Sequence, residues 1–357
     1  MWDNDREMRR VIGNEEGIAL FLVLWVLALL TVIVGEFCYT MRTEANITRN
    51  FKEETEAYYI AEAGLNRAIV ELIRNERIPQ KVQTSESEEE EVEERLRVNT
   101  DIPPVSFGGG QFKVHVASES GKINLNTANN ALLKMILSGF GLEDENRDVI
   151  VDSILDWRDK DQFHRVNGAE DDYYRSLSEP YECRDGDFQS VEELLLVRGV
   201  TPELFYGGLE KIVTVYGEES TPKSKTKKKT AEGKININAA DYHMLISLPG
   251  MTEDLVRAII DYRKVSDFKK MSEVIEIVGP EVYKSIKSYI TMDTIPYFTI
   301  TSVGTTGDGK TRRGVEAFVK IDVKAKKGYR VIRWLDNAPC DGFSEQIEQT
   351  EADSRGQ

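Results

Sequence analysis

The residues most suited to chemistry lie in one acidic stretch, DKDQFHRVNGAEDDYYRSLSEPYECRDGD, at residues 159–187. It holds nine carboxylates and only four Lys or Arg residues. Carboxylates crowded in an ordered loop repel one another unless a cation joins them. Ca²⁺ fits best, because it accepts about six to eight oxygen ligands in flexible geometry. An EF-hand is excluded, since Phe163 falls where its third oxygen ligand should stand. Taken alone, these residues leave two interpretations open, a calcium site and a solvated acidic loop.

Other residue types that carry chemistry show no recognisable site. The three cysteines, Cys38, Cys183 and Cys340, are not spaced for zinc. Cys183 and Cys340 would form a disulfide if the soluble part faces an oxidising compartment, but buried free cysteines are equally consistent with the sequence. None of the three histidines stands beside a Ser or Cys nucleophile in a known frame, and no P-loop is present. We therefore expect no enzyme activity.

An internal repeat must position the acidic stretch. The segments GKINLNTANNALLKMILSGFG and GKININAADYHMLISLPGMT begin at Gly121 and Gly233, and each continues into a helix that ends in DWR or DYR. The second copy needs four residues between DYR and Phe268, whereas the first spends 29 between DWR and Phe188. The acidic stretch is thus an insertion within one of two small helical bundles. The predicted repeats are residues 121–217 and 233–292, joined by a linker at 218–232.

The segment LISLPGMTEDLVRAII in the second repeat resembles a helix-hairpin-helix motif, which in nucleic-acid-binding proteins holds a phosphate on backbone N–H groups. Here Thr252 replaces one expected glycine, and in the first repeat Glu143, Asp144 and Glu145 follow the hairpin directly. The formal net charge of −16 also disfavours phosphate binding. We interpret the hairpins as structural and expect no nucleic acid. A membrane-anchored DNA-binding protein of competence type is the alternative.

One segment is hydrophobic enough to enter a membrane. Residues 18–34 contain no charge, and a helical pattern without proline continues to Glu76, which predicts one helix over residues 18–77. Alternating apolar residues predict one strand before residue 120 and three after residue 296. The expected fold class is α+β: a long N-terminal helix packed on an antiparallel β-sheet, with a large inserted all-α domain containing helix-hairpin-helix-like repeats.

The N-terminus resembles that of type IV pilin-like proteins. Gly17 follows charged residues and precedes the apolar run, and YYIAEAGLNRAI comes later in the same predicted helix. The resemblance implies that a prepilin peptidase cuts between Gly17 and Ile18 and that the new N-terminus is methylated. Most members carry glutamate at the fifth mature position, where this chain has Leu22. That departure is shared by the K-type minor pseudopilins of bacterial type II secretion systems.

A second motif, DWRDKDQ…NGAEDDYY at residues 156–174, looks like a signature of the same family. The family is known for calcium in its helical domain, so the resemblance favours the calcium interpretation. Asp156 or Asn167 would be further contributors. The calcium ligands that we expect are Asp159, Asp161, Glu170, Asp171, Asp172 and Asp187.

The resemblance covers nearly the whole chain and implies a minor pseudopilin that initiates and caps the tip of the pseudopilus, supporting export of folded proteins across the outer membrane. Its partners would be the I- and J-type minor pseudopilins, the major pseudopilin and the prepilin peptidase. The chain would span the bacterial inner membrane once, with its C-terminal domain in the periplasm. A minor pilin of a type IV pilus is a further alternative. The expected divisions are the leader 1–17, the membrane and assembly part of the helix 18–35, the rest of the helix with an acidic loop and the first strand 36–120, the helical domain 121–292, the C-terminal strands 293–340 and a polar tail 341–357.

Overall fold

The computed structural model describes residues 4–77, 98, 103–217 and 233–340, and of residues 4–17 only the backbone. The predicted acidic loop after the helix, the linker at 218–232 and the tail at 341–357 lie outside these ranges. The chain divides into two compact units, Met1–Ala57 and Tyr58–Gln357.

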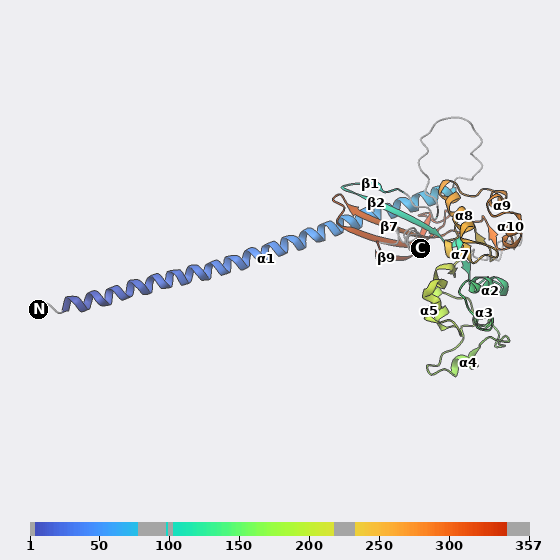
Figure 1. The fold of residues 1–357 in the computed structure, drawn as a ribbon, viewed down its shortest axis with the longest axis horizontal. Coiled ribbons are helices and arrows are strands. Elements are labelled where there is room, and N and C mark those ends of the chain that lie inside the picture. The colour runs from blue at the N-terminus through green and yellow to red at the C-terminus, as the bar shows by residue number, and fades with distance from the viewer. Residues whose placement is uncertain (1–3, 78–97, 99–102, 218–232, 341–357) are drawn as a thin grey trace, which may run out of the picture. The chain divides into compact units, whose positions relative to one another are not determined.

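The first unit is formed by the N-terminal part of helix α1 (Asn4–Arg77), which is blue in Figure 1. The expected helix over residues 18–77 is confirmed, and it begins earlier, at Asn4. All side chains of residues 18–50 are exposed, and Ile18–Glu76 is long and apolar enough to cross a membrane. The Thr31 hydroxyl in the apolar run donates to the Leu27 carbonyl over 2.8 Å. The helix therefore satisfies its own polar groups in this segment, as hydrocarbon requires.

The second unit contains a five-stranded antiparallel sheet in the order β1-β2-β7-β8-β9 (Figure 1). Its strands are β1 (Val105–Phe107), β2 (Gly110–Ser118), β7 (Tyr297–Thr306), β8 (Arg312–Ile321) and β9 (Tyr329–Ala338). The predicted strand before residue 120 is β2, and the three after residue 296 are β7, β8 and β9. The short strand β1 was not predicted. Strands β2 and β7 are neighbours in the sheet but are separated by nearly 180 residues of sequence, with Val114 opposite Ser302.

One face of this sheet packs on the C-terminal part of α1. Apolar residues spaced three and four apart on the helix form a core with alternate residues of the strands, as the pattern predicted. Gly64 allows a close approach of the helix to the sheet, since an added Cβ would lie 2.5 Å from Ser302 Oγ and 2.7 Å from the Phe112 ring. The buried helical residues of this core are Ile60, Ala61, Leu65, Ala68, Ile69 and Leu72.

The helical domain occupies the chain between β2 and β7 and has one apolar core built from both repeats. The Tyr216 ring packs on Tyr297 and Phe318 of the sheet, with centroids 5.3 and 4.6 Å apart. The first repeat contains η2 (Glu119–Gly121), β3 (Ile123–Asn124), α2 (Asn130–Ser138), α3 (Asp144–Arg158), α4 (Asp171–Arg175), η3 (Val191–Leu196), α5 (Pro202–Leu204), η4 (Phe205–Leu209), α6 (Glu210–Ile212) and β4 (Val213–Thr214). The second contains β5 (Ile235–Asn236), α7 (Tyr242–Ile246), α8 (Glu253–Val265), α9 (Met271–Val278), α10 (Pro280–Ile286) and β6 (Ile290–Thr291).

The two repeats make matching contacts at matching positions. Arg158, the last residue of α3, donates to the carbonyls of Leu125 and Ala128. Arg263 of α8 donates in the same way to Ile237 and Ala240, over 3.3 and 2.6 Å. These pairs of carbonyls lie between the first short strand of each repeat and its next helix, so each arginine ties that connection to a helix.

A second matching contact fixes the residue where the repeats rejoin after their helices. The Asn126 side chain pairs with the backbone of Phe188, accepting its N–H over 2.7 Å and donating to its carbonyl over 3.0 Å. Asn238 does the same with Phe268, over 2.8 and 3.0 Å. The acidic stretch thus begins just after one anchored residue, Arg158, and ends just before another, Phe188.

Candidate metal centre

The acidic stretch is ordered around a buried carboxylate from α3. Asp156 is fully buried, and its carboxylate accepts the backbone N–H of Arg165 over 3.0 Å and forms an ion pair with the Arg165 guanidinium. The same guanidinium bonds to Asp159 Oδ2 over 2.6 Å. Gly168 lies so close to Asp156 that any larger residue would collide with its carboxylate. Burial raises the pKa of Asp156, and Arg165 opposes that shift.

Three of the expected ligands come together. Carboxylate oxygens of Asp159, Asp161 and Glu170 all lie within 4.8 Å of one another. Glu170 is 2% exposed, and neither of its oxygens has a hydrogen-bond partner among the described residues. Burial raises its pKa to about 7, with the nearby carboxylates adding to the shift and the Cys183 thiol opposing it. A buried acid without a partner is costly in free energy unless a cation or a proton compensates it.

The other three expected ligands lie outside this group and make local contacts. Asp171 accepts the backbone N–H of Cys183 over 2.8 Å and forms an ion pair with Arg175 over 2.8 Å. Asp172 accepts the N–H of Tyr173 over 2.8 Å. Asp187 has an exposed side chain, and its backbone carbonyl accepts from Arg184. Of the two further contributors considered, Asp156 is engaged by Arg165, and Asn167 donates to Asp152.

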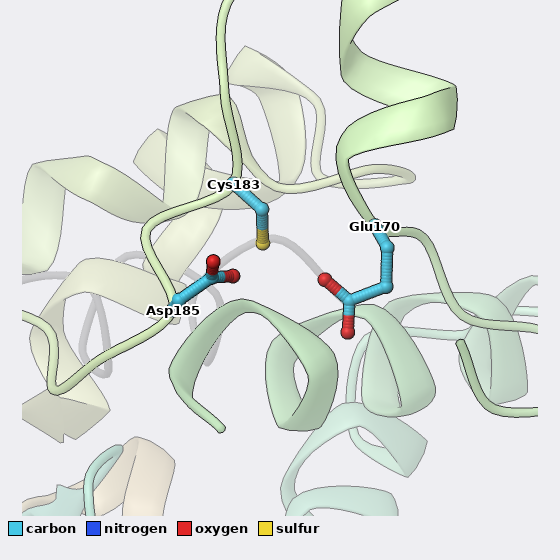
Figure 2. Close-up of side chains that lie close together, drawn as sticks. All are labelled: Glu170, Cys183 and Asp185. Atoms are coloured by element: carbon cyan, nitrogen blue, oxygen red, sulfur yellow. The ribbon is translucent and has the colours of Figure 1, made fainter. Parts of the chain in front are cut away.

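Two residues that sequence reasoning did not include also approach Glu170. Figure 2 shows Cys183 and Asp185 turned toward its carboxylate, and the ligand atoms of the three residues lie within 4.8 Å of one another. Asp185 has φ 52°, a left-handed conformation that only glycines share among the described residues. The Asp-Gly pair in ECRDGD is a turn signal that could have indicated this geometry. Cys183 and Cys340 are both free in the structure, so the disulfide considered from the sequence is absent from it.

A cluster of aromatic side chains packs next to the acidic stretch. Trp157 packs edge-on against Tyr174 with ring centroids 5.2 Å apart, and stacks on Phe188 at 6.4 Å. The Tyr174 hydroxyl accepts the N–H of Arg198 over 3.3 Å, and Arg198 in turn donates to the Gly168 carbonyl over 3.0 Å. These contacts connect Trp157 and Phe188, which flank the acidic stretch, with Tyr174 and Gly168 inside it.

Comparison with known proteins shows which family this chain resembles. Residues 112–218 match the family model of the type II secretion system (T2SS), protein K, and residues 230–291 match a helix-hairpin-helix motif. The chain is 25% identical over 282 residues to the type II secretion system protein K of Pseudomonas aeruginosa, covering 74% of this chain and 78% of that protein. This chain belongs to the K-type minor pseudopilins.

The pseudopilin is also 24% identical over 216 residues to the type II secretion system protein K of Pectobacterium carotovorum, covering 54% of this chain and 61% of that protein. Among solved structures, the GspK-GspI-GspJ complex from the enterotoxigenic Escherichia coli type 2 secretion system contains a chain with 16% identity and a TM-score of 0.49. That likeness covers 84% of this chain and 100% of the other.

The hairpins of this pseudopilin carry acids where a phosphate would approach. Helix α8 begins after Thr252, whose side chain accepts the N–H of Leu255 over 3.4 Å, and its first turn holds Glu253 and Asp254. Helix α3 begins after Glu143, with Asp144 and Glu145 in its first turn. Such acids complement the helix dipole and compete with a bound phosphate.

Proposed function

We propose that this pseudopilin initiates and caps the tip of the type II secretion pseudopilus and so supports export of folded proteins across the outer membrane. The observation that carries this proposal is Leu22, which stands where most pilin-like chains have glutamate. A carboxylate in an apolar bundle is costly unless it is paired. In pilins it is thought to pair with the N-terminal amine of a neighbouring subunit. A chain with leucine there needs no such neighbour and is suited to stand first.

The size of the helical domain supports the same position. The whole domain is inserted between two strands that are neighbours in the sheet. A domain of residues 121–292 would obstruct the addition of a further subunit above it. A subunit that cannot be followed on one side terminates a polymer there, so the bulk of the domain agrees with the absence of glutamate at Leu22.

The location and partners are part of this proposal. The apolar run at residues 18–34 would lie in the inner membrane before assembly, as a single pass, with the C-terminal domain in the periplasm. The partners would be the I- and J-type minor pseudopilins and the major pseudopilin. A prepilin peptidase would cut between Gly17 and Ile18. The family assignment and the exposed apolar face of α1 support this arrangement.

Calcium is the cofactor that we propose. The residues present fit it, because buried carboxylate oxygens without partners face two further carboxylates and Ca²⁺ prefers oxygen ligands. Asp159, Asp161 and Glu170 would hold the ion. When bound, it would neutralise the repulsion among these acids. The protein itself supplies the fixed frame, in which Arg165 ties Asp156 and Asp159 together.

The tip position can be tested with carboxylates placed at two neighbouring positions. Leu22→Glu should move the subunit from fibre ends into fibre shafts, because the new acid can pair with a neighbour's amine. Val23→Glu places a carboxylate in the apolar run one residue away from the position where pilins carry glutamate, and Leu22→Met keeps that position apolar. Leu22→Met should keep the native distribution of subunits on the fibre. Val23→Glu should either keep that distribution or fail to insert into the membrane, and it should not move into fibre shafts. The measurement is the position of labelled subunits on isolated fibres, together with secretion.

A native-like distribution of Leu22→Glu at fibre ends would contradict the proposal. Co-purification separates the alternatives. Capture of other minor pseudopilins without DNA supports the tip role, whereas DNA binding at moderate salt without these partners would favour the competence-type alternative. Assembly into a retractable surface pilus would favour the minor pilin.

A further inference from the structure

Strand β9 forms one edge of the five-stranded sheet. It pairs with β8, and its other side has no neighbouring strand in the part of the chain that the structure describes (Figure 1). The strand is ten residues long, and residues 330–337 are all exposed. An edge of this length presents backbone N–H and C=O groups to which a further strand can bind. We propose that β9 binds an extended acidic segment of another protein, which adds to the sheet as a further strand.

Apolar side chains on the α1-facing side of β9 favour contact with another chain. Val331 lies opposite Val319 of the α1-facing core and is 40% exposed. Trp334 lies opposite Ala317 of the same core and is 36% exposed. The Trp334 indole N–H donates to Asp336 Oδ1 over 2.6 Å, which fixes the direction of the ring. Exposed apolar residues on a long edge strand promote association with other chains, so an added strand that covers them would gain stability.

The other face of β8 and β9 is basic. Arg330 lies opposite Lys320, and the exposed Arg333 forms an ion pair with Glu316 over 3.2 Å. The two strands together hold five Lys or Arg residues and two acids, in a chain whose formal net charge is −16. Acidic side chains of an added strand would find opposite charges on this face, and such cross-strand pairs are stabilising.

The same features disfavour a second copy of this chain as the occupant. Two copies of β9 placed edge to edge would bring basic residues of one copy beside those of the other, and like charges on neighbouring strands are destabilising. The β8–β9 register also shifts twice, between Val331 and Arg333 and between Leu335 and Ala338. Such bulges restrict an edge to partners that match it. The bound segment therefore comes from another protein and alternates acidic with apolar residues.

Hydrogen exchange of the full chain in detergent micelles, followed by mass spectrometry, tests the proposal. The probe is a synthetic peptide of about ten residues that alternates glutamate and valine. At about ten times its dissociation constant it should slow exchange in residues 329–338 by about tenfold, because binding competes with opening. Exchange at β1, the other edge of the sheet, should not change. A peptide that alternates lysine and valine should protect neither edge.

Two backbone-methylated forms of the probe separate strand addition from charge attraction alone. An added strand pairs along only one of its edges. Methylation of every glutamate nitrogen and methylation of every valine nitrogen should therefore have opposite effects: one form should lose binding and the other should keep it. Both measurements use the native chain, so they do not depend on the folding of a variant.

Charge reversal tests the basic face. Arg330→Glu combined with Arg333→Glu should weaken binding of the glutamate-valine peptide by about tenfold or more, because attractive cross-strand pairs become repulsive. Arg257→Glu combined with Lys287→Glu is the matched control. Both of these residues are exposed in the helical domain, so this variant has the same change of net charge and should bind the peptide as the native chain does.

Several results would overturn the proposal: no protection of β9 by the glutamate-valine peptide, equal binding of the two methylated forms, or equal affinities of the two charge-reversal variants. A concentration-dependent dimer with β9 protected would make a second copy the occupant instead. Protection of β9 without peptide that is lost on removal of residues 341–357 would make this chain's own tail the occupant. None of these results bears on the tip function, which is read from fibres.

Discussion

At the scale of single residues, the site depends on which acids form an ion pair with Arg165 and which do not. Arg165 pairs with Asp156 and Asp159, and neither oxygen of Glu170 has a hydrogen-bond partner in the part of the chain that the structure describes. Glu170 is the most deeply buried of the six predicted ligands and belongs to both candidate groups. Its free oxygens therefore control whether the loop is stable by itself or depends on a bound ion.

Loss of one calcium ligand should weaken a measurable stabilisation. Ca²⁺ at about 100 times its dissociation constant should stabilise the native chain by about 2.7 kcal/mol. Asp161→Asn should lower the affinity by about tenfold or more, because a charged ligand is lost. Calorimetric titration with Ca²⁺ and EGTA, and the melting temperature, are the measurements. Asp172→Asn is the control, since that carboxylate lies outside the group. No heat and no melting shift in the native chain would remove the calcium proposal.

The stability of the cation-free chain should depend on pH through Glu170. Its pKa is about 7 in the folded chain, above the ordinary value of 4.5. The folded state therefore binds the proton more tightly, and the stability from this group is present below about pH 4.5 and is lost as pH rises through about 7. The loss amounts to as much as about 3 kcal/mol.

Glu170→Gln stays neutral, so it should be more stable than the native chain at about pH 8 in EGTA and similar near pH 4.5. Urea unfolding at the two pH values measures the difference. Glu182→Gln, whose side chain is 72% exposed, is the control and should follow the native chain. Equal pH dependence of Glu170→Gln and the native chain would show that Glu170 is not the group responsible.

At the scale of elements, α1 and the sheet meet where the helix has no side chain. Gly64 lies against Ser302 and Phe112, and the alternating residues of β2 and β7 fill the space on either side. In the helical domain, the side chains of Arg158 and Arg263 donate to backbone carbonyls in the connection that follows the first short strand of each repeat. The glycine contact and the arginine hydrogen bonds each fix the position of an element, and close packing leaves little room for substitution at these residues.

Gly64→Ala should loosen the helix from the sheet. The new methyl group would lie 2.5 Å from Ser302 Oγ, and overpacking of this kind typically costs about 1–3 kcal/mol. The matched control is Gly35→Ala in the same helix, where nothing lies within 4 Å of the added carbon and helix propensity should improve. Thermal unfolding of the full chain in detergent compares them. A Gly64→Ala melting temperature at or above that of Gly35→Ala would contradict the packing.

Arg263→Met should destabilise the second repeat. Arg263 is 6% exposed and donates to two carbonyls, which the substitution leaves unpaired at a cost of about 1–3 kcal/mol each. Arg257→Met, on the same helix but with a side chain 53% exposed, should change stability little. Urea denaturation gives both values. Similar midpoints for the two variants would show that the buried arginine does not support the repeat.

Sequence patterns predicted the long elements and the internal repeat, because the spacing of apolar residues indicates which face of a helix or strand is buried. Strand β1 was missed since three residues are too few to show alternation. In the site, Asp159, Asp161 and Glu170 were expected together, and the structure brings them together. Cys183 and Asp185 were not, because their approach to Glu170 depends on a left-handed turn. Asp171 and Asp172 show the converse, since nearby N–H groups engage acids that the sequence presents as free ligands.

At the scale of the whole molecule, one chain combines an apolar helix, a sheet with an α1-facing core and a domain inserted between neighbouring strands. The helical part at residues 18–50 has its side chains exposed, so its stability as a single element depends on lipid or on other helices. The uncharged residues 18–34 contribute nothing to the formal net charge of −16. The charged residues and the uncharged apolar run thus lie in different parts of the chain.

For the whole molecule we predict that the N-terminus is matured by cleavage between Gly17 and Ile18. Removal of residues 1–17 would delete a charged leader and leave Ile18 as the first residue, so the apolar run could enter a bundle of helices without the leader's charges. Mass spectrometry of the chain from secreting cells should find a methylated N-terminal Ile18. Gly17→Glu should block cleavage and leave the intact leader, with loss of fibre assembly, whereas Gly13→Ala in the leader should mature normally. An intact leader on the native chain in assembled fibres would contradict this maturation, and with it the entry of the helix into a pilin-like bundle.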